Sequence, residues 1–309
     1  MAATAVSRRS VSRGTGRRRT FSPGRGLAWI YIIAILVITI FPFYWILRTA
    51  LSTNNALLTD PSSIWPAGFS LGAFERVLGL TSKAQAIAQG GSGASVDIPL
   101  YLRNSIIYAS IVTACVVFCS ALAAYAFSRL RWRGRDVVFS IFLSALLLPG
   151  IYTLLPNFVF IKDIGLLNTF PGMALPTALF SAFGIFFLRQ FMLGLSTEIE
   201  EAAILDGAGR LTVLFRIVLP MTSVPLTTLT LLTFINTWND YFWPLLVANN
   251  QSTEPLTLGL ALFKQASPET APDWAGLMAA TCVAALPMLL LFMVFGRRIV
   301  NAIGFTGLR

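Results

Sequence analysis

Charged side chains gather in one short stretch of the chain, between two long apolar ones. This stretch, residues 200–220, contains Glu200, Glu201, Asp206, Arg210 and Arg216. So many charges are too costly to place in the hydrocarbon of a bilayer, so the stretch is expected to lie in water or against another protein. It is therefore a candidate protein-contact segment.

The same stretch has the pattern of two short helices joined by a bend. Thr197-Glu-Ile-Glu200 has the form of a capping box, in which the Thr hydroxyl accepts from a free backbone N–H and the Glu three residues later reaches back. The alanine-rich run 202–205 favours helix, and the two glycines within 206–209 supply a break. The sequence predicts a short amphipathic helix, a bend, and a second helix interrupted at Pro220.

A second candidate site surrounds Asp240, the one acid within an apolar span. Its polar and aromatic neighbours are Asn236, Trp238, Asn239 and Tyr241. An ionisable residue within a membrane segment is a functional candidate by default. At 1.5 Å per residue, about 30 Å of helix separates it from the start of the span, which places it near the outer interface. Two uses stay open: contact with a polar solute such as a sugar ring, or a hydrogen bond between helices at the interface.

Composition excludes several kinds of chemistry. The 309 residues are 56% hydrophobic and only 12% charged, far more apolar than a soluble domain. Histidine, the commonest general base and metal ligand, is absent, which argues against a membrane-embedded enzyme. Cys115, Cys119 and Cys282 fall in apolar runs and have no metal-binding or disulfide spacing. No phosphate-binding G-x-x-x-x-G-K-[ST] motif occurs, so the chain cannot hydrolyse ATP by itself. We expect no catalytic residue, cofactor or metal.

The elements that must position these residues are membrane spans, each needing about 20 apolar residues. Six stretches qualify: 27–47, 104–128, 137–160, 172–194, 217–247 (interrupted by prolines) and 276–296. Seventeen of the 23 lysines and arginines fall on the side of the N-terminus, and such residues are enriched in cytoplasmic loops. Both termini and the 200–220 loop are therefore expected to be cytoplasmic. The positive charge is an orientation signal, and no nucleic-acid partner is expected.

The loop matches a spaced motif. Glu201-Ala-Ala203 is followed after three residues by Gly207 and, nine residues later, by Ile217-Val-Leu-Pro220. This pattern resembles the cytoplasmic loop of the membrane subunits (permeases) of ATP-binding-cassette (ABC) importers. Further motifs resemble the carbohydrate-uptake branch, in particular the smaller membrane subunit of the maltose importer: Leu102-Arg-Asn-Ser105, Ala123-Ala-Tyr-Ala-Phe127, Gly165-Leu-Leu-Asn168 and Trp238-Asn-Asp240.

The resemblance implies an all-α polytopic membrane protein with six transmembrane helices and a cytoplasmic coupling helix between spans four and five. ATP would be hydrolysed by a separate ATPase subunit, present in two copies, and Glu201 would pair with a basic residue in a cleft of that subunit. The residues assigned to this coupling are Glu200, Glu201, Ala202, Ala203, Ile204, Leu205, Asp206 and Gly207. The residues assigned to the substrate pathway are Asn236, Trp238, Asn239, Asp240 and Tyr241.

The resemblance also implies partners and a location. These are a second, homologous membrane subunit, an extracytoplasmic solute-binding protein and the lipid bilayer of a prokaryotic cytoplasmic membrane. The chain would divide into a disordered basic cytoplasmic tail (1–26), the first transmembrane helix with an external loop (27–102), a permease core (103–297) with its coupling loop (195–216), and a cytoplasmic C-terminal tail (298–309). Within the external loop, two short amphipathic pieces are expected near 72–80 and 82–89.

The expected cargo is a mono-, di- or oligosaccharide. Two alternatives stay open. One is the same type of importer acting on glycerol phosphate, an amino acid or a polyamine. The other is an ion-coupled secondary transporter acting alone. Such a transporter is expected to have buried acids or broken helices at the membrane midplane in two matching halves of the chain, and the sequence shows neither.

Overall fold

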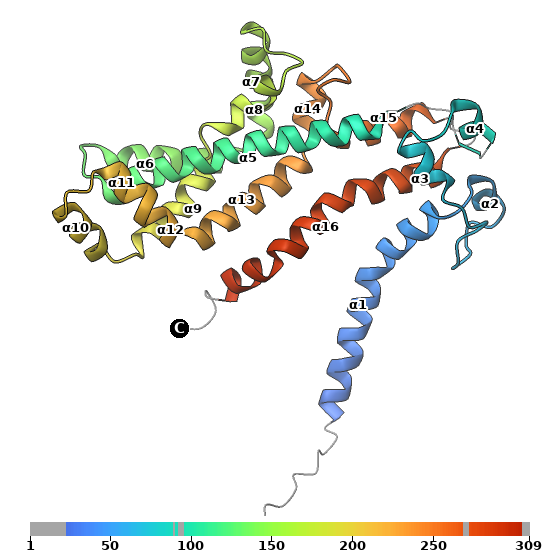
Figure 1. Cartoon of the computed structure of the whole chain (residues 1–309), viewed down its shortest axis with the longest axis horizontal. Coiled ribbons are helices and arrows are strands. Elements are labelled where there is room, and N and C mark those ends of the chain that lie inside the picture. Colours follow the sequence, from blue (N-terminus) through green and yellow to red (C-terminus); the bar gives the residue numbers. More distant parts are fainter. Residues whose placement is uncertain (1–22, 89, 92–95, 268–271, 305–309) are drawn as a thin grey trace, which may run out of the picture. The chain divides into compact units, whose positions relative to one another are not determined.

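The computed structural model describes residues 23–88, 90–91, 96–267 and 272–304, and within these ranges all regular structure is helical (Figure 1). The tail that was expected to be disordered falls outside the described residues as far as residue 22. Two units can be distinguished along the chain, one up to Trp45 and one from Ile46 onward.

The first unit is formed by the greater part of helix α1 (Pro23–Ala50). The apolar stretch Gly26–Ala50 is long enough to cross a bilayer. Aliphatic side chains are exposed along it, including Ile30, Val37 and Ile38. Between Gly26 and Leu47 no side chain is buried, and an apolar helix of this kind suits a lipid environment.

In the second unit, three short helices follow α1: α2 (Asn54–Thr59), α3 (Gly72–Val77) and α4 (Lys83–Ala88). The two short pieces predicted near 72–80 and 82–89 are confirmed as α3 and α4, whereas α2 was not predicted.

The long helix α5 (Ile98–Arg129) is the element around which the second unit is arranged. It starts with Asp97, whose carboxylate accepts from Leu100 N at 3.0 Å, and with Pro99 in its first turn, where the missing N–H costs nothing. Helices α8 (Phe170–Ala178), α9 (Ala182–Leu193), α13 (Ser223–Trp238) and α15 (Leu256–Ala266) pack along it (Figure 1). The last helix, α16 (Trp274–Gly304), contacts α3, α13 and α15.

Three of the six predicted spans are not continuous helices. Helix α6 (Arg135–Ser144) with its 3₁₀ extension to Leu147 is bent by 106° against α7 (Ile151–Asp163). Helices α8 and α9 meet at 49°. The segment Arg210–Met221, which comprises α11 (Arg210–Val213), the π-helical turn Leu214–Val218 and α12 (Leu219–Met221), meets α13 at 79°. The described residues thus contain three unbroken helices that could cross a membrane, or up to six candidate spans if each bent pair is one span.

The expectation of one span over 217–247 is also wrong at its end. Helix α13 stops at Trp238, and the short helix α14 (Phe242–Val247) follows after a break. Asp240 therefore lies in an irregular segment between two helices rather than inside a helix.

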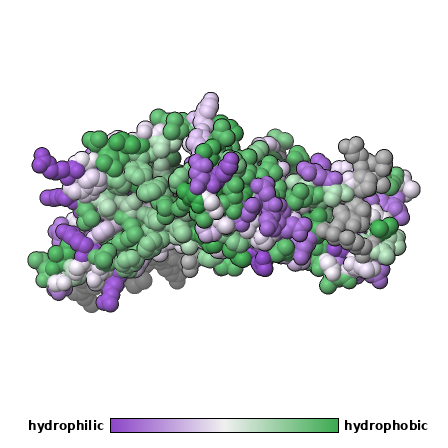
Figure 2. Space-filling view, turned by 90° about the horizontal axis from the view of Figure 1, so that it is seen from above, coloured by the Kyte–Doolittle hydropathy of each residue, from purple (hydrophilic) through white to green (hydrophobic). Residues whose placement is uncertain are grey.

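Much of the surface of the second unit is apolar. Figure 2 shows hydrophobic residues over a large part of the face that it presents. Exposed large apolar side chains on α5 and α16 include Ile106, Ile111, Phe118, Leu289, Leu290 and Phe292. Apolar surface on this scale marks contact with lipid or with other subunits.

Candidate functional site

The predicted coupling segment forms helix α10 (Glu198–Leu205), followed by a turn. The turn is closed by hydrogen bonds from Gly207 N to Ile204 O (3.0 Å) and from Ala208 N to Ala203 O (2.9 Å). Gly207 has φ = +88°, a left-handed conformation that glycine adopts without steric cost and that commonly ends helices. The helix and bend expected from the sequence are both present.

The capping box expected at Thr197 is not formed. The Thr197 side chain makes no cap hydrogen bond, and Glu198 N donates instead to Ser196 Oγ at 3.2 Å. Glu200, the residue that was to reach back, is buried and turned toward the end of α5. The Glu200 carboxylate is buried beside a cation, which offsets the cost of burying its charge, so it is not available to complete the capping box.

The partner of Glu200 is Arg129, the last residue of α5. Arg129 Nε lies 2.7 Å from Glu200 Oε1, and the two side chains are only 8% and 7% exposed. Arg129 Nη2 also donates to Leu195 O, just after α9, at 2.9 Å. One guanidinium group thus joins the end of α5 to α10 and to the segment that precedes it.

The eight predicted coupling residues divide between two faces. Ala203 and Ile204 pack inward against a core cluster that includes Leu188 of α9 and Val213 and Leu214 of the following segment. The outward face of α10 presents Glu198, Glu201, Ala202 and Leu205, and the turn beyond it presents Asp206 and Gly207. Leu205 is 89% exposed, which is unusual for an apolar side chain beside so many charges. The outward face of α10 therefore offers both charge and apolar area to a partner.

The second candidate site lies at the break that holds Asp240. Tyr108 Oη, from α5, donates to Asp240 Oδ2 at 3.2 Å, and the backbone N–H groups of Tyr241 and Trp243 donate to the same carboxyl group. Thr257 Oγ1 of α15 donates to Asp240 O at 2.7 Å. A hydrogen bond between Asp240 and another helix, one of the two uses left open by the sequence, is therefore present.

A cavity of about 410 Å³ lies beside Asp240. We call it the Asp240 cavity. Its other polar lining residues are Tyr108, Thr177, Ser181, Thr233, Asn236 and Thr237. Of the five predicted pathway residues, only Asn236 and Asp240 line it. Trp238 is buried and stacks on Phe234 at 5.9 Å between ring centroids, while Asn239 Nδ2 donates to Ile235 O.

Sequence reasoning missed the lining residues on α5 and around the break between α8 and α9. On α5, the lining residues Tyr108, Val112 and Val116 are spaced four apart and so share one face of the helix. The same pattern is typical of a helix face that packs against other helices, so it did not indicate a cavity.

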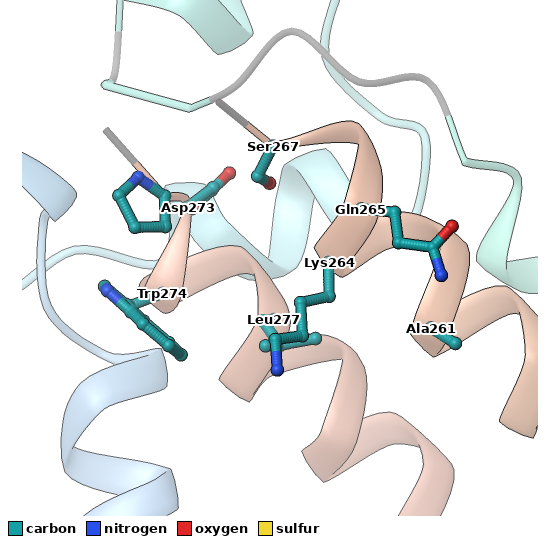
Figure 3. Close-up of a pocket in the computed structure, with 8 residues that line it drawn as sticks. Ala261, Lys264, Gln265, Ser267, Asp273, Trp274 and Leu277 are labelled. Carbon is teal, nitrogen blue, oxygen red and sulfur yellow. The ribbon is translucent and has the colours of Figure 1, made fainter. Parts of the chain in front are cut away.

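A second cavity, of about 630 Å³, lies where α15 ends and α16 begins (Figure 3). It is lined by Lys264, Gln265, Ser267, Asp273 and Trp274 among others. Asp273 is bound by Arg76 of α3 at 3.1 Å and accepts from Gly276 N at 2.7 Å. Its carboxylate is therefore engaged in holding α3 against α16.

Apolar helices long enough to cross a bilayer, with an exposed amphipathic helix in one connecting loop, are the features of a polytopic membrane protein. Residues 107–304 match the family described as "Binding-protein-dependent transport system inner membrane component". The chain belongs to this family, and it is a component of a transport system.

Relatives and a solved structure agree with this membership. The chain is 29% identical over 280 residues to the trehalose/maltose transport system permease protein MalG of Thermococcus litoralis, covering 90% of this chain and 95% of that protein. It is 28% identical over 287 residues to the sn-glycerol-3-phosphate transport system permease protein UgpE of Agrobacterium fabrum, covering 90% and 95%. Its fold is similar to a chain of a bacterial ABC transporter involved in the import of the acidic polysaccharide alginate, with a TM-score of 0.76 at 23% identity, covering 92% of this chain and 99% of that chain.

Proposed function

We propose that this chain is a permease subunit of a prokaryotic sugar importer that receives its cargo from an extracytoplasmic binding protein and is driven by ATP hydrolysed in a separate subunit. The observation that carries the proposal is the outward face of α10, where Glu201, Ala202 and the almost fully exposed Leu205 form a contact surface on a helix anchored from behind. A complete complex would contain two ATPase subunits and a second, homologous membrane subunit.

In this proposal α10 acts as a lever. Its inward face is fixed to α5 by the Arg129–Glu200 ion pair and to α9 by apolar packing, so a force applied to α10 reaches both helices. Glu201, one residue further on, stays available for a basic residue of the ATPase. Leaving one partner of a desolvated charge pair unmatched costs about 2–5 kcal/mol, enough to decide whether the subunits assemble.

The proposed topology has six spans, with both termini and α10 in the cytoplasm. The three unbroken candidate helices and three bent pairs support the count, and the asymmetry of lysine and arginine supports the orientation. The division into a basic tail (1–26), a first span with external loop (27–102), a core (103–297) and a C-terminal tail (298–309) is part of the same proposal. Single cysteines at Asp206, in the exposed turn, and at Glu75, in the external loop, test it in a variant whose three native cysteines are replaced by alanine. They should label from opposite sides of the membrane.

The proposed cargo is a sugar, supported by the similarity to a trehalose/maltose permease. A second candidate is a glycerol phosphate, because a similar degree of identity links the chain to an sn-glycerol-3-phosphate permease. For either cargo, the proposed pathway passes the Asp240 cavity, with Asn236 and Asp240 in its wall.

Purification of the tagged chain from detergent-solubilised native membranes, with mass spectrometry of the bound proteins, tests the proposal. We expect an ATPase, a second membrane subunit and a solute-binding protein to be recovered, and the reconstituted complex to import sugar only with ATP on the ATPase side. Recovery of the chain alone, with uptake driven by an ion gradient, would overturn the proposal and favour a secondary transporter.

A further inference from the structure

The Asp240 cavity is assembled from three separate parts of the chain. Tyr108 comes from α5, Thr177 and Ser181 flank the break between α8 and α9, and Asn236 lies in the last turns of α13. The volume of about 410 Å³ lies within the range of about 300–1,000 Å³ that is usual for small-molecule sites. The cavity is thus large enough for a mono- or disaccharide unit and too small for a macromolecule.

The polar groups of the lining keep hydrogen-bonding capacity for a ligand. Within the described residues, the Asn236 amide and the hydroxyl groups of Thr233 and Thr237 make no hydrogen bond. Thr177 Oγ1 donates to Ala174 O at 3.3 Å and keeps its acceptor sites. A hydroxyl group both donates and accepts, so a mixed set of amide and hydroxyl groups suits a ligand that carries many hydroxyls.

The lining of the Asp240 cavity carries negative charge. Among the described residues that line the cavity, Asp240 is the only charged one, and none is a lysine or arginine. Its carboxylate is oriented by Tyr108 at 3.2 Å and by two backbone N–H groups, and it retains lone pairs that could accept from a ligand hydroxyl. A carboxylate repels an anion that enters the same small space.

The N-terminus of helix α9 is a feature of the cavity that favours anions. The N-terminus of α9 meets the cavity at Ser181, and helix N-termini attract anions. However, Ser181 Oγ already accepts from Gly184 N at 3.0 Å, so one of the free donors of that terminus is occupied. Without an arginine or lysine beside it, this terminus does not offset the carboxylate.

We propose that the Asp240 cavity is a contact site for an uncharged, polyhydroxylated ligand and that Asp240 discriminates against anionic ligands of the same shape. Tyr108 positions the carboxylate, Asn236 and the threonine hydroxyls bind ligand hydroxyls, and Phe183 offers an apolar face to a sugar ring. This inference rests on the proposed function, because it names the class of cargo that the pathway admits. It favours a neutral sugar over a glycerol phosphate.

Equilibrium binding of two radiolabelled probes to the complete complex in lipid nanodiscs tests the proposal. The probes are maltose and maltose 6′-phosphate, which differ in charge while sharing both rings. We expect the wild-type complex to bind maltose at least tenfold more tightly than the phosphate. Asp240→Asn removes the charge and keeps the shape, so it should reduce that ratio to threefold or less by tightening phosphate binding.

A second variant keeps the test decisive if Asp240→Asn fails to fold. Asn236→Asp adds a negative charge to the wall without touching the Tyr108–Asp240 bond, and it should widen the ratio by a further tenfold. An unchanged ratio in the variants that fold, or binding of neither probe by the wild-type complex, would overturn the inference. ATP-driven sugar uptake, measured in parallel, reports on the proposed function separately: uptake with an unchanged ratio contradicts only the inference.

Discussion

The guanidinium group of Arg129 lies 2.7 Å from the carboxylate of Glu200, and both side chains are buried. Arg129 ends α5 and Glu200 lies in α10, so this contact connects the longest helix of the second unit to the loop helix. The neighbouring Glu201 is exposed. Two consecutive glutamates therefore lie in different environments, one buried and paired within the chain and one exposed at its surface.

Removal of the Glu200 charge should destabilise the folded chain. Glu200→Gln leaves Arg129 buried without its counter-charge, and loss of one partner from a buried pair costs about 3–5 kcal/mol. Thermal unfolding in detergent should show a clear fall in Tm. Glu198→Gln, on the exposed side of the same helix, is the matched control and should leave Tm within error. Equal Tm values for both variants would contradict a stabilising role of the ion pair.

Reversal of the Glu201 charge should abolish assembly without unfolding the chain. Glu201→Lys places a cation where the proposed ATPase partner is basic, and the exposed position tolerates the longer side chain. Co-purification of the ATPase should fall by at least tenfold, with membrane insertion unchanged. Glu75→Lys, an exposed charge reversal on α3, serves as the control. An intact complex with full ATP-driven uptake in the Glu201→Lys variant would contradict the coupling proposal.

Truncation of the Leu205 side chain should weaken binding of the ATPase without changing the stability of the folded chain. The side chain is 89% exposed in the isolated chain, so Leu205→Ser removes almost no internal contact. If a partner covers it, the substitution forfeits about 1.5–3 kcal/mol of apolar burial, which corresponds to roughly a ten- to hundredfold weaker complex. Titration of the purified ATPase against the chain in nanodiscs measures this loss. An unchanged Tm with unchanged affinity would mean that Leu205 faces solvent in the complex as well.

A methyl group at Gly259 should loosen the contact between α5 and α15. A Cβ atom built there would lie 2.7 Å from Cγ of Tyr101, whose ring is held by a 3.0 Å hydrogen bond from its hydroxyl to Glu254. The ring cannot turn away without losing that bond, so Gly259→Ala should cost about 1–3 kcal/mol through overpacking. Gly209→Ala, where a Cβ meets no atom within 4 Å, is the control for measurement by Tm. Equal Tm values for the two variants would show that the helices shift apart freely.

Local sequence predicted the elements that depend on local properties. The run of helix formers before Gly207 gave α10, and the glycine itself marked the left-handed turn that ends it. Apolar length marked the six candidate stretches, because transfer of a segment into hydrocarbon depends on its own composition. Continuity was harder to judge. The prolines at 149 and 220 lie at two of the bends, yet Pro42 and Pro287 lie inside unbroken helices.

Pairings between distant parts of the chain were not predictable in this way. Glu200 fitted a capping box with Thr197, and only the packing of α10 against the end of α5 gave the carboxylate a buried cation instead. Helices α2 and α15 were not predicted. The six residues of α2 are too few to show a helical period, and the 11 mostly apolar residues of α15 are too few for a membrane span.

The sequence by itself determined that this is an apolar, helical protein with one charged loop helix, and its spaced motif indicated the family. Tertiary structure decided which face of α10 is exposed. It also placed Asp240 in a break between helices, beside Tyr108 and a cavity with both polar and apolar lining residues. The physical reason is the distance along the chain over which each interaction acts. Hydrophobicity and turn chemistry act within a few residues, whereas burial of Arg129 with Glu200, or of Tyr108 with Asp240, requires helices far apart in the chain to meet first.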